Sequence, residues 1–172
     1  TTAYIARGVW ASNFGTAGNA YAVMGENAGS IYTSGEYAYG ILAEIGNASN
    51  AGTATAIMNG GLIETQNRQG PGIYAFSKGT GATIAQMSDG EIVTEGTNST
   101  GIYSFIYNST NLASATATLL GGKITTHGAS SSGLMAYSTG LGSTIAVMQD
   151  GDLSTSEASS IGVYSYISNV AN

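Results

Sequence analysis

The stretch Gly101-Ile-Tyr-Ser-Phe-Ile106, followed by Ala115-Thr-Ala-Thr-Leu119 and Lys123-Ile-Thr-Thr126, decides the fold of this chain. In each of the three segments the side chains alternate in character with a period of two, which is the period of a β-strand. The residues between the segments include glycine, asparagine and serine, which are typical of turns. The stretch therefore predicts three short strands joined by turns.

The same three segments recur along the chain. The first begins with a glycine followed by an aliphatic, a large and a small residue. These motif glycines are Gly8, Gly40, Gly72, Gly101, Gly133 and Gly162, so their sequence numbers differ by 32, 32, 29, 32 and 29. Between them lie an Ala-x-Met segment, a glycine turn and an Ile-x-Thr segment. Three strands per repeat predict an all-β parallel β-helix of about five and a half coils.

The repeat has a rigid half and a variable half. From the Met or Leu that ends the second segment to the next motif glycine, the spacing is 14 in four copies. In the first copy this spacing is 16, which places an insertion near Glu26-Asn27. The other half alternates, because the spacing is 18 from Gly40 to Met58 but 15 from Gly72 to Met87. The alternation makes a super-repeat with a spacing of 61 and indicates duplication of a two-coil unit.

Alternation along each strand assigns side chains to two faces. The position after the motif glycine is aliphatic and the next but one is small, so both are expected to face inward. The first of these inward columns is Val9, Ile41, Ile73, Ile102, Leu134 and Val163. The second and third strands are expected to add Met58, Met87, Leu119 and Met148, and Ile31, Ile63, Ile92, Ile124 and Leu153. Coils with a long loop are expected to add Ile45, Ile106 and Ile167.

Aromatic residues occupy the outward positions of the first strand. Stacked coils would align them as two neighbouring ladders, formed by Trp10, Tyr74, Tyr103 and Tyr164 and by Phe76, Phe105, Tyr137 and Tyr166. Aromatic residues suit strands and stabilise one another across a sheet, so the ladders can be purely structural. An apolar stripe on the surface also suits contact with another protomer or with a glycan. These eight residues are therefore a candidate contact face.

Composition excludes several classes of protein. Charged residues make up 8% of the chain, against roughly 25% in an average soluble domain, but eleven tyrosines and many β-branched residues indicate a folded chain. The net charge of −6 includes only four Lys and Arg residues, which argues against nucleic acid as a partner. No apolar run approaches the ~20 residues that span a bilayer. The absence of cysteine excludes disulfides and thiolate metal sites.

Paired carboxylates are the chemistry of sugar-cleaving β-helix enzymes. The best candidates are Asp89 with Glu91 and Asp150 with Asp152, which flank turn glycines and are related by the same spacing of 61. Lys123 stands at the corresponding position of the intervening coil. We interpret the four acids as turn residues that favour solubility, in preference to a weak calcium site or a catalytic pair.

His127 is the only histidine of the chain. No cysteine or carboxylate stands at motif spacing from it, so the sequence offers no second member of a catalytic triad or zinc site. We expect His127 to be a solvated residue in the turn after Thr126. The sequence therefore predicts no catalytic residue, no metal site and no cofactor.

Two longer stretches resemble a known family. Gly90-Glu-Ile-Val-Thr-Glu-Gly-Thr-Asn-Ser-Thr-Gly-Ile-Tyr-Ser104 and Gly122-Lys-Ile-Thr-Thr-His-Gly-Ala-Ser-Ser-Ser-Gly-Leu-Met-Ala136 are similar to the repeats of autotransporter (type V secretion) passenger domains of Gram-negative bacteria. The resemblance covers nearly the whole chain. It implies a right-handed β-helix, export through the outer membrane, and display or release at the cell surface, often as an adhesin or a self-associating factor.

These observations favour a non-enzymatic structural or adhesive module, secreted or displayed on the bacterial outer surface. Residues 1–172 are expected to form one domain whose partner is a second copy of itself or a host or glycan surface. The alternative is a β-helix of the lyase or tailspike kind that binds or cleaves carbohydrate. Neither Thr1 nor Asn172 lies in a recognisable capping element, so we expect a fragment of a longer passenger or a subunit that stacks end to end.

Overall fold

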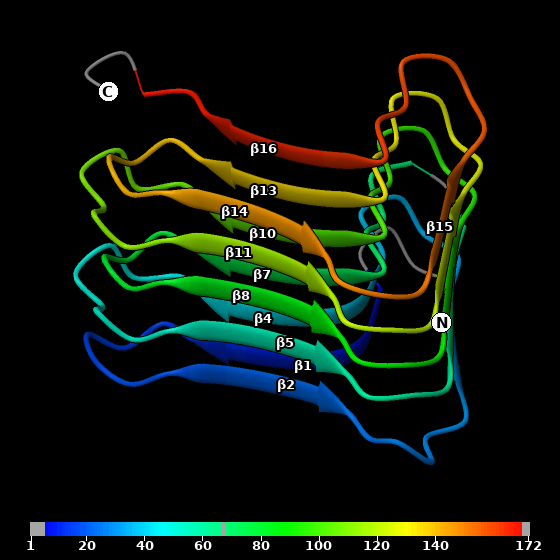
Figure 1. Ribbon diagram of the computed structural model, residues 1–172. Helices are drawn as coiled ribbons and strands as arrows, with labels where there is room; N and C mark the ends of the chain where they lie inside the picture. Colours follow the sequence, from blue (N-terminus) through cyan, green and yellow to red (C-terminus); the bar gives the residue numbers. More distant parts are fainter. Residues whose placement is uncertain (1–5, 67, 170–172) are drawn as a thin grey trace.

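The computed structural model describes residues 6–66 and 68–169, which contain sixteen β-strands and no helix. The strands wind into a column of five coils with three strands each, followed by one strand of a sixth coil (Figure 1). Equivalent strands of successive coils pair in parallel and form three sheets that run along the column. The predicted all-β parallel β-helix is confirmed.

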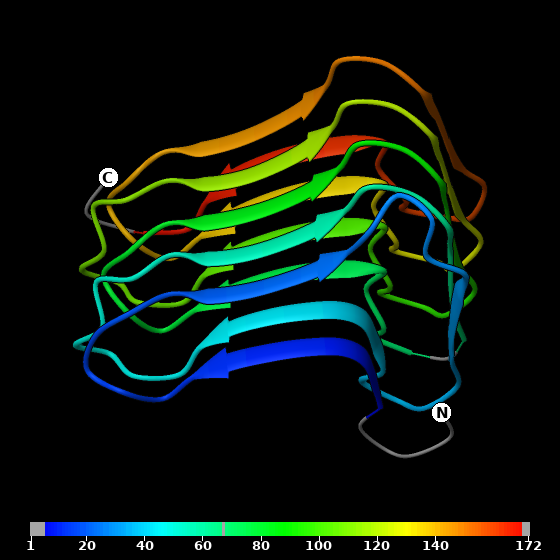
Figure 2. The same ribbon diagram turned by 90° about the horizontal axis from the view of Figure 1, so that it is seen from below.

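Each sheet collects the strands of one kind. Sheet A contains β1 (Arg7–Asn13), β4 (Tyr39–Ile45), β7 (Ile73–Ser77), β10 (Ile102–Ile106), β13 (Leu134–Ser138) and β16 (Val163–Ile167). Sheet B contains β2 (Ala20–Met24), β5 (Ala54–Met58), β8 (Thr83–Met87), β11 (Ala115–Leu119) and β14 (Thr144–Met148). Sheet C contains β3 (Ser30–Thr33), β6 (Leu62–Thr65), β9 (Glu91–Thr94), β12 (Lys123–Thr126) and β15 (Asp152–Thr155). Seen from below, the strands of sheets A and B lie opposite one another (Figure 2).

The inward columns predicted from alternation form the core of the column. In sheet A, Ile102 pairs with Ile73 on one side and with Leu134 on the other, and all three are fully buried. The Met/Leu column of sheet B and the Ile column of sheet C belong to the same core. The last coil differs, because Met148 is 40% exposed and Val163 is 43% exposed where no described strand covers them.

Four of the motif glycines, Gly8, Gly40, Gly72 and Gly101, are required by the packing between sheets A and C. A Cβ atom on Gly101 would lie 2.5 Å from Cγ2 of Ile124 and 2.7 Å from the carbonyl oxygen of Gly133. Such distances are too short for any side chain, so the third-strand isoleucine occupies the space that a side chain would need. The glycine and the isoleucine of the two sequence motifs are thus one packing unit.

The predicted alternation of long and short loops has a structural counterpart. In the long-loop coils Ile45 and Ile106 are buried, whereas the paired positions of the short-loop coil hold the buried Ser77. The hydroxyl of Ser77 accepts a hydrogen bond from the backbone N–H of Gly79. Polar loop closure therefore replaces apolar packing in this short-loop coil.

The long loops are fastened by buried asparagines. The side chain of Asn111 donates to the carbonyl oxygens of Gly79 and Gly81 in the preceding coil and accepts from the N–H of Ala113. Asn50 occupies the equivalent place in the earlier long loop, where it is also fully buried. These amides satisfy backbone groups that the turns would otherwise leave unpaired inside the column.

Candidate functional site

The outward face of sheet A carries a continuous band of aromatic rings, which we name the aromatic stripe. Its members are Tyr39, Tyr74, Phe76, Tyr103, Phe105, Tyr107, Tyr137, Tyr164 and Tyr166. Neighbouring ring centroids lie 4.9 Å apart for Tyr74 and Tyr103 and 5.0 Å apart for Phe105 and Tyr137. The rings meet because the parallel register places equivalent outward residues beside one another in successive coils.

Seven of the eight predicted contact residues belong to this stripe, and Trp10 does not. Leu42 lies between Trp10 and Tyr74 in the register of sheet A. The Trp10 ring instead lies under the guanidinium group of Arg7, at 4.1 Å from the ring centroid. Met135 likewise separates Tyr103 from Tyr164, and Tyr164 joins the stripe sideways, through Tyr166.

A hollow of about 470 Å³ lies beside the stripe, and we name it the tyrosine groove. One wall consists of Tyr74, Tyr103 and Met135 from the outward face of sheet A, with the ring of Tyr39 beside that of Tyr74. The other wall comes from the corners between sheets C and A, and its residues are Tyr37, Gln69, Pro71, Asn98, Thr100, Ser130 and Ser132. The groove therefore runs across four successive coils. No charged side chain lines it among the described residues.

The corner residues reach the groove because the backbone turns in the same way in successive coils. Gln69, Asn98 and Ser130 have φ angles of 59°, 56° and 57°, in the left-handed region that few side chains favour. This conformation directs each N–H to the next coil, as where Asn98 donates to the carbonyl oxygen of Ala129 at 3.0 Å. Hydrogen bonds between coils thus hold the groove wall in place.

Burial favours the neutral form of three groove tyrosines, Tyr39, Tyr74 and Tyr103. Burial raises the pKa of Tyr74 well above its usual value, and the neighbouring Tyr103 and Tyr39 add to that shift. Burial is also the main cause that raises the pKa of Tyr103 and of Tyr39. These phenols remain hydrogen-bond donors and acceptors at every physiological pH.

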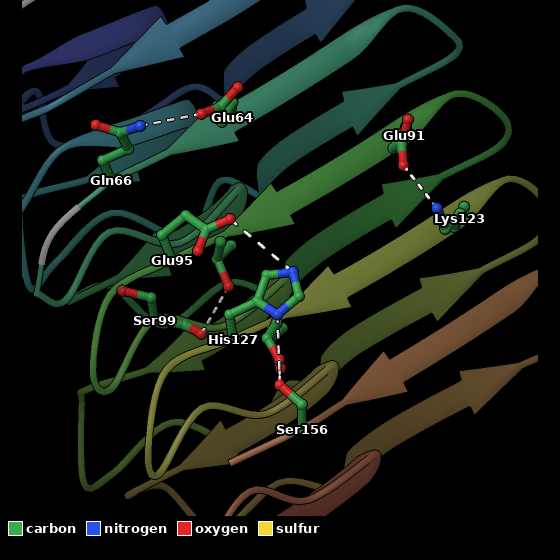
Figure 3. A network of polar contacts seen from close by, with 10 residues as sticks. Glu64, Gln66, Glu91, Glu95, Ser99, Lys123, His127 and Ser156 are labelled. Atoms are coloured by element: carbon green, nitrogen blue, oxygen red, sulfur yellow. Dashed lines mark hydrogen bonds and ion pairs between the residues drawn. The ribbon is translucent and has the colours of Figure 1, made fainter.

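Three of the four acidic residues singled out from the sequence serve turns or a surface ion pair, and the fourth, Asp152, lies beside Lys123 in the register. The carboxylate of Asp89 accepts from the N–H of Gly90, and that of Asp150 accepts from the N–H of Gly151, both at 2.7 Å. Lys123 lies beside Glu91 in the register and forms an ion pair with it at 2.9 Å, with both side chains about half exposed (Figure 3). The geometry gives these acids structural tasks, in keeping with their interpretation as turn residues.

His127 has two neighbours that the sequence did not indicate. Its Nε2 lies 3.9 Å from a carboxylate oxygen of Glu95, and its Nδ1 lies 3.4 Å from the Ser156 hydroxyl (Figure 3). The three residues stand at equivalent places in successive coils and are therefore far apart in the chain. His127 and Glu95 are 45% and 43% exposed, and both contacts are long for hydrogen bonds, so this is a solvated surface cluster.

Sequence reasoning missed the polar wall of the groove. Gln69, Asn98 and Ser130 each stand three positions before a motif glycine, and Thr100 and Ser132 stand directly before one. Their constant distance in sequence from the motif glycine is a signal that could have identified the polar wall. The side chains at these offsets differ from coil to coil, which hid the pattern.

Comparisons with protein-family models, with curated proteins and with solved structures found no match to this chain. Within residues 6–66 and 68–169 there is no cluster of three or more histidine, aspartate or glutamate side chains that could hold a metal ion. The same part of the chain has no helix that could cross a membrane.

Proposed function

We propose that this chain is a non-enzymatic adhesive module of a secreted or surface-displayed protein, of the kind found in autotransporter passengers. The observation that carries the proposal is the aromatic stripe, which extends along sheet A from Tyr39 to Tyr166 beside a neutral groove. Aromatic side chains supply much of the binding energy of protein contacts. A column that repeats such rings in successive coils offers a long surface for multiple weak contacts.

Partial exposure of the stripe supports a contact role beyond strand preference. Tyr107 is 59% exposed and Tyr166 is 46% exposed, while the rings between them are half-buried against one another. If the rings served only to cover the sheet, less of their apolar surface would be exposed to water. Apolar surface that stays exposed favours association with another molecule. The stripe is thus rigid and accessible at once, as a binding surface should be.

Carbohydrate cleavage is the less favoured function. Three of its four candidate acids, Asp89, Asp150 and Glu91, cap turns or pair with Lys123. The cluster around His127 is exposed and lies outside the tyrosine groove. General acid–base catalysis needs such groups within reach of a bound substrate. Carbohydrate binding without cleavage is compatible with the neutral polar lining of the groove.

The test replaces the part of the stripe that lies outside the groove. In the variant Phe76→Thr, Phe105→Thr, Tyr137→Thr each new residue is a good strand former, so the fold should survive with a loss of about 1–3 kcal/mol. We expect this variant to adhere much less strongly than the wild type to surfaces coated with glycans or with cells. Sedimentation velocity over a concentration series measures self-association in the same samples.

The matched control removes apolar side chains from another face. Ile57→Thr, Ile84→Thr, Val147→Thr changes outward positions of sheet B and should leave adhesion unchanged. Equal adhesion of the folded stripe variant and the wild type would contradict the proposal. A stripe variant that loses only self-association would assign the stripe to contacts between copies of this chain.

A further inference from the structure

We propose that the tyrosine groove binds a neutral oligosaccharide whose chain follows the column axis. The inference rests on the proposed adhesive function, because it names the class of ligand that the face beside the stripe takes. A volume of about 470 Å³ lies within the usual range of ligand sites, roughly 300–1,000 Å³, and suits a few sugar units.

Four polar side chains of the groove are free to bind a ligand. No hydrogen bond within the described residues engages the hydroxyls of Tyr74 and Tyr103 or the side-chain amides of Gln69 and Asn98. These donors and acceptors line the hollow without an internal partner, so a ligand that displaces water can bond to them. Sugar hydroxyls both donate and accept, so they match phenols and amides, which do the same.

The arrangement of the rings decides how a sugar would be held. Tyr74 and Tyr103 are stacked with an angle of 12° between their planes, so each covers one face of the other. On the outer side of the pair, Tyr39 lies 5.4 Å from Tyr74 between ring centroids and Met135 lies beside Tyr103 in the register. Their edges and hydroxyls are what the pair offers to a ligand. Recognition in the groove therefore depends on hydrogen bonds, and the stacking of sugar rings on open aromatic faces is secondary here.

The absence of charge in the lining selects for a neutral ligand. An acidic glycan would have to bury carboxylates or sulfates in a chain of net charge −6, with no cation among the described groove residues. A smaller neighbouring hollow of about 200 Å³ has a charged lining, where Arg7 faces the same space as Glu44. Neutral hexoses meet no such penalty.

The repeat of the column fits the repeat of a polysaccharide. Gln69, Asn98 and Ser130 occupy equivalent corner positions in three successive coils, and stacked coils are ~4.8 Å apart. One pyranose unit of an extended chain has a similar length. Successive sugars along the axis would therefore meet successive corner residues.

The experiment removes the two amides without disturbing the backbone. In the variant Gln69→Gly, Asn98→Gly both residues are replaced by the one that adopts positive φ most readily, so folding should be preserved. Ser159→Gly is the matched control, because Ser159 has the same backbone conformation in the next corner but does not line the groove. The probes are the hexasaccharides of maltose, cellulose and mannan, with oligogalacturonate of the same length as the acidic counterpart.

Calorimetric titration should show that at least one neutral hexasaccharide binds to the wild-type chain and that oligogalacturonate does not. The double-glycine variant should raise the Kd at least about tenfold, and Ser159→Gly should change it less than about twofold. Failure of every neutral probe to bind at about 1 mM, preference for oligogalacturonate, or equal binding by the double-glycine variant would each overturn the inference. Adhesion that still depends on Phe76, Phe105 and Tyr137 would then leave the proposed function standing.

Discussion

Two tyrosines of sheet A, Tyr74 and Tyr103, have pKa values raised by their surroundings. Tyr74 and Tyr103 pack ring to ring and lose much of their contact with water, whereas Tyr21 on sheet B is 64% exposed. Loss of hydration disfavours the phenolate, and this is the main reason that the pKa of both ladder tyrosines is raised. The free energy of unfolding therefore depends on pH through these two tyrosines, because the stacking of the coils buries them.

The direction of this pH dependence follows from the difference in bound protons between the folded and unfolded states. Above a pH of about 10 the unfolded chain releases the protons of Tyr74 and Tyr103, while the folded chain retains them. The folded state then binds more protons, so stability that is complete below this pH is lost as the pH rises. Urea midpoints between neutral pH and about pH 11 should fall for the wild type and fall less for Tyr74→Phe, Tyr103→Phe.

The control for this effect is Tyr21→Phe, which removes a hydroxyl outside the stripe. It should follow the wild-type curve. Parallel curves for all three proteins would show that the ladder phenols are not the groups that resist ionisation.

At the scale of the element, the loops contribute as much order as the strands. The long loop between β10 and β11 contains two asparagines of different kinds. Asn111 is fully buried and bonded to the preceding coil, whereas the carboxamide oxygen of Asn108 serves its own exposed turn by accepting from Thr110. One closes the loop onto the column, and the other shapes its outer rim.

Asn111→Ala should therefore destabilise the fold by about 2–3 kcal/mol, because it leaves two buried carbonyl groups and one N–H without partners. Asn108→Ala in the same loop should cost less than about 1 kcal/mol. Urea denaturation of both variants measures the difference. Similar losses would mean that the exposed hydrogen bonds of Asn108 hold the loop as strongly as the buried ones of Asn111.

At the scale of the whole molecule, equivalent residues differ because the column has ends. Met58 and Met148 occupy the same inward position of sheet B, yet Met58 is fully buried and Met148 is 40% exposed. β14 and β15 are the last described strands of sheets B and C at the C-terminal end of the column, where no further described strand covers their inward side chains. Stability is therefore expected to be greatest in the middle coils.

Met58→Ala should lower the free energy of unfolding by about 2–5 kcal/mol, as for other large-to-small changes in a packed core. Met148→Ala should lower it by less than about 1 kcal/mol, because little packing is lost at an open position. Chemical denaturation of the pair measures both values. Equal losses would indicate that the last coil is covered in solution, for instance by a second copy of the chain.

Much of this molecule is fixed by short-range features of the sequence. The period of two and the repeat length determine the strands, the three sheets and the buried columns, and the alternation between spacings of 18 and 15 anticipates long and short loops. These properties are predictable because parallel coils stack in register, so every equivalent position inherits the same surroundings. Most of the aromatic stripe follows for the same reason.

Only the tertiary structure decided which of the non-equivalent residues meet. Leu42 separates Trp10 from the stripe, Glu95 and Ser156 come to lie beside His127, and the tyrosine groove assembles from corners and strands of four coils. Such contacts join segments that are one coil or more apart in the chain, and they depend on corner φ angles and side-chain directions that no local pattern specifies. The repeats of the sequence determine the scaffold. Which of the residues that vary between repeats come into contact is decided only by the stacking of the coils.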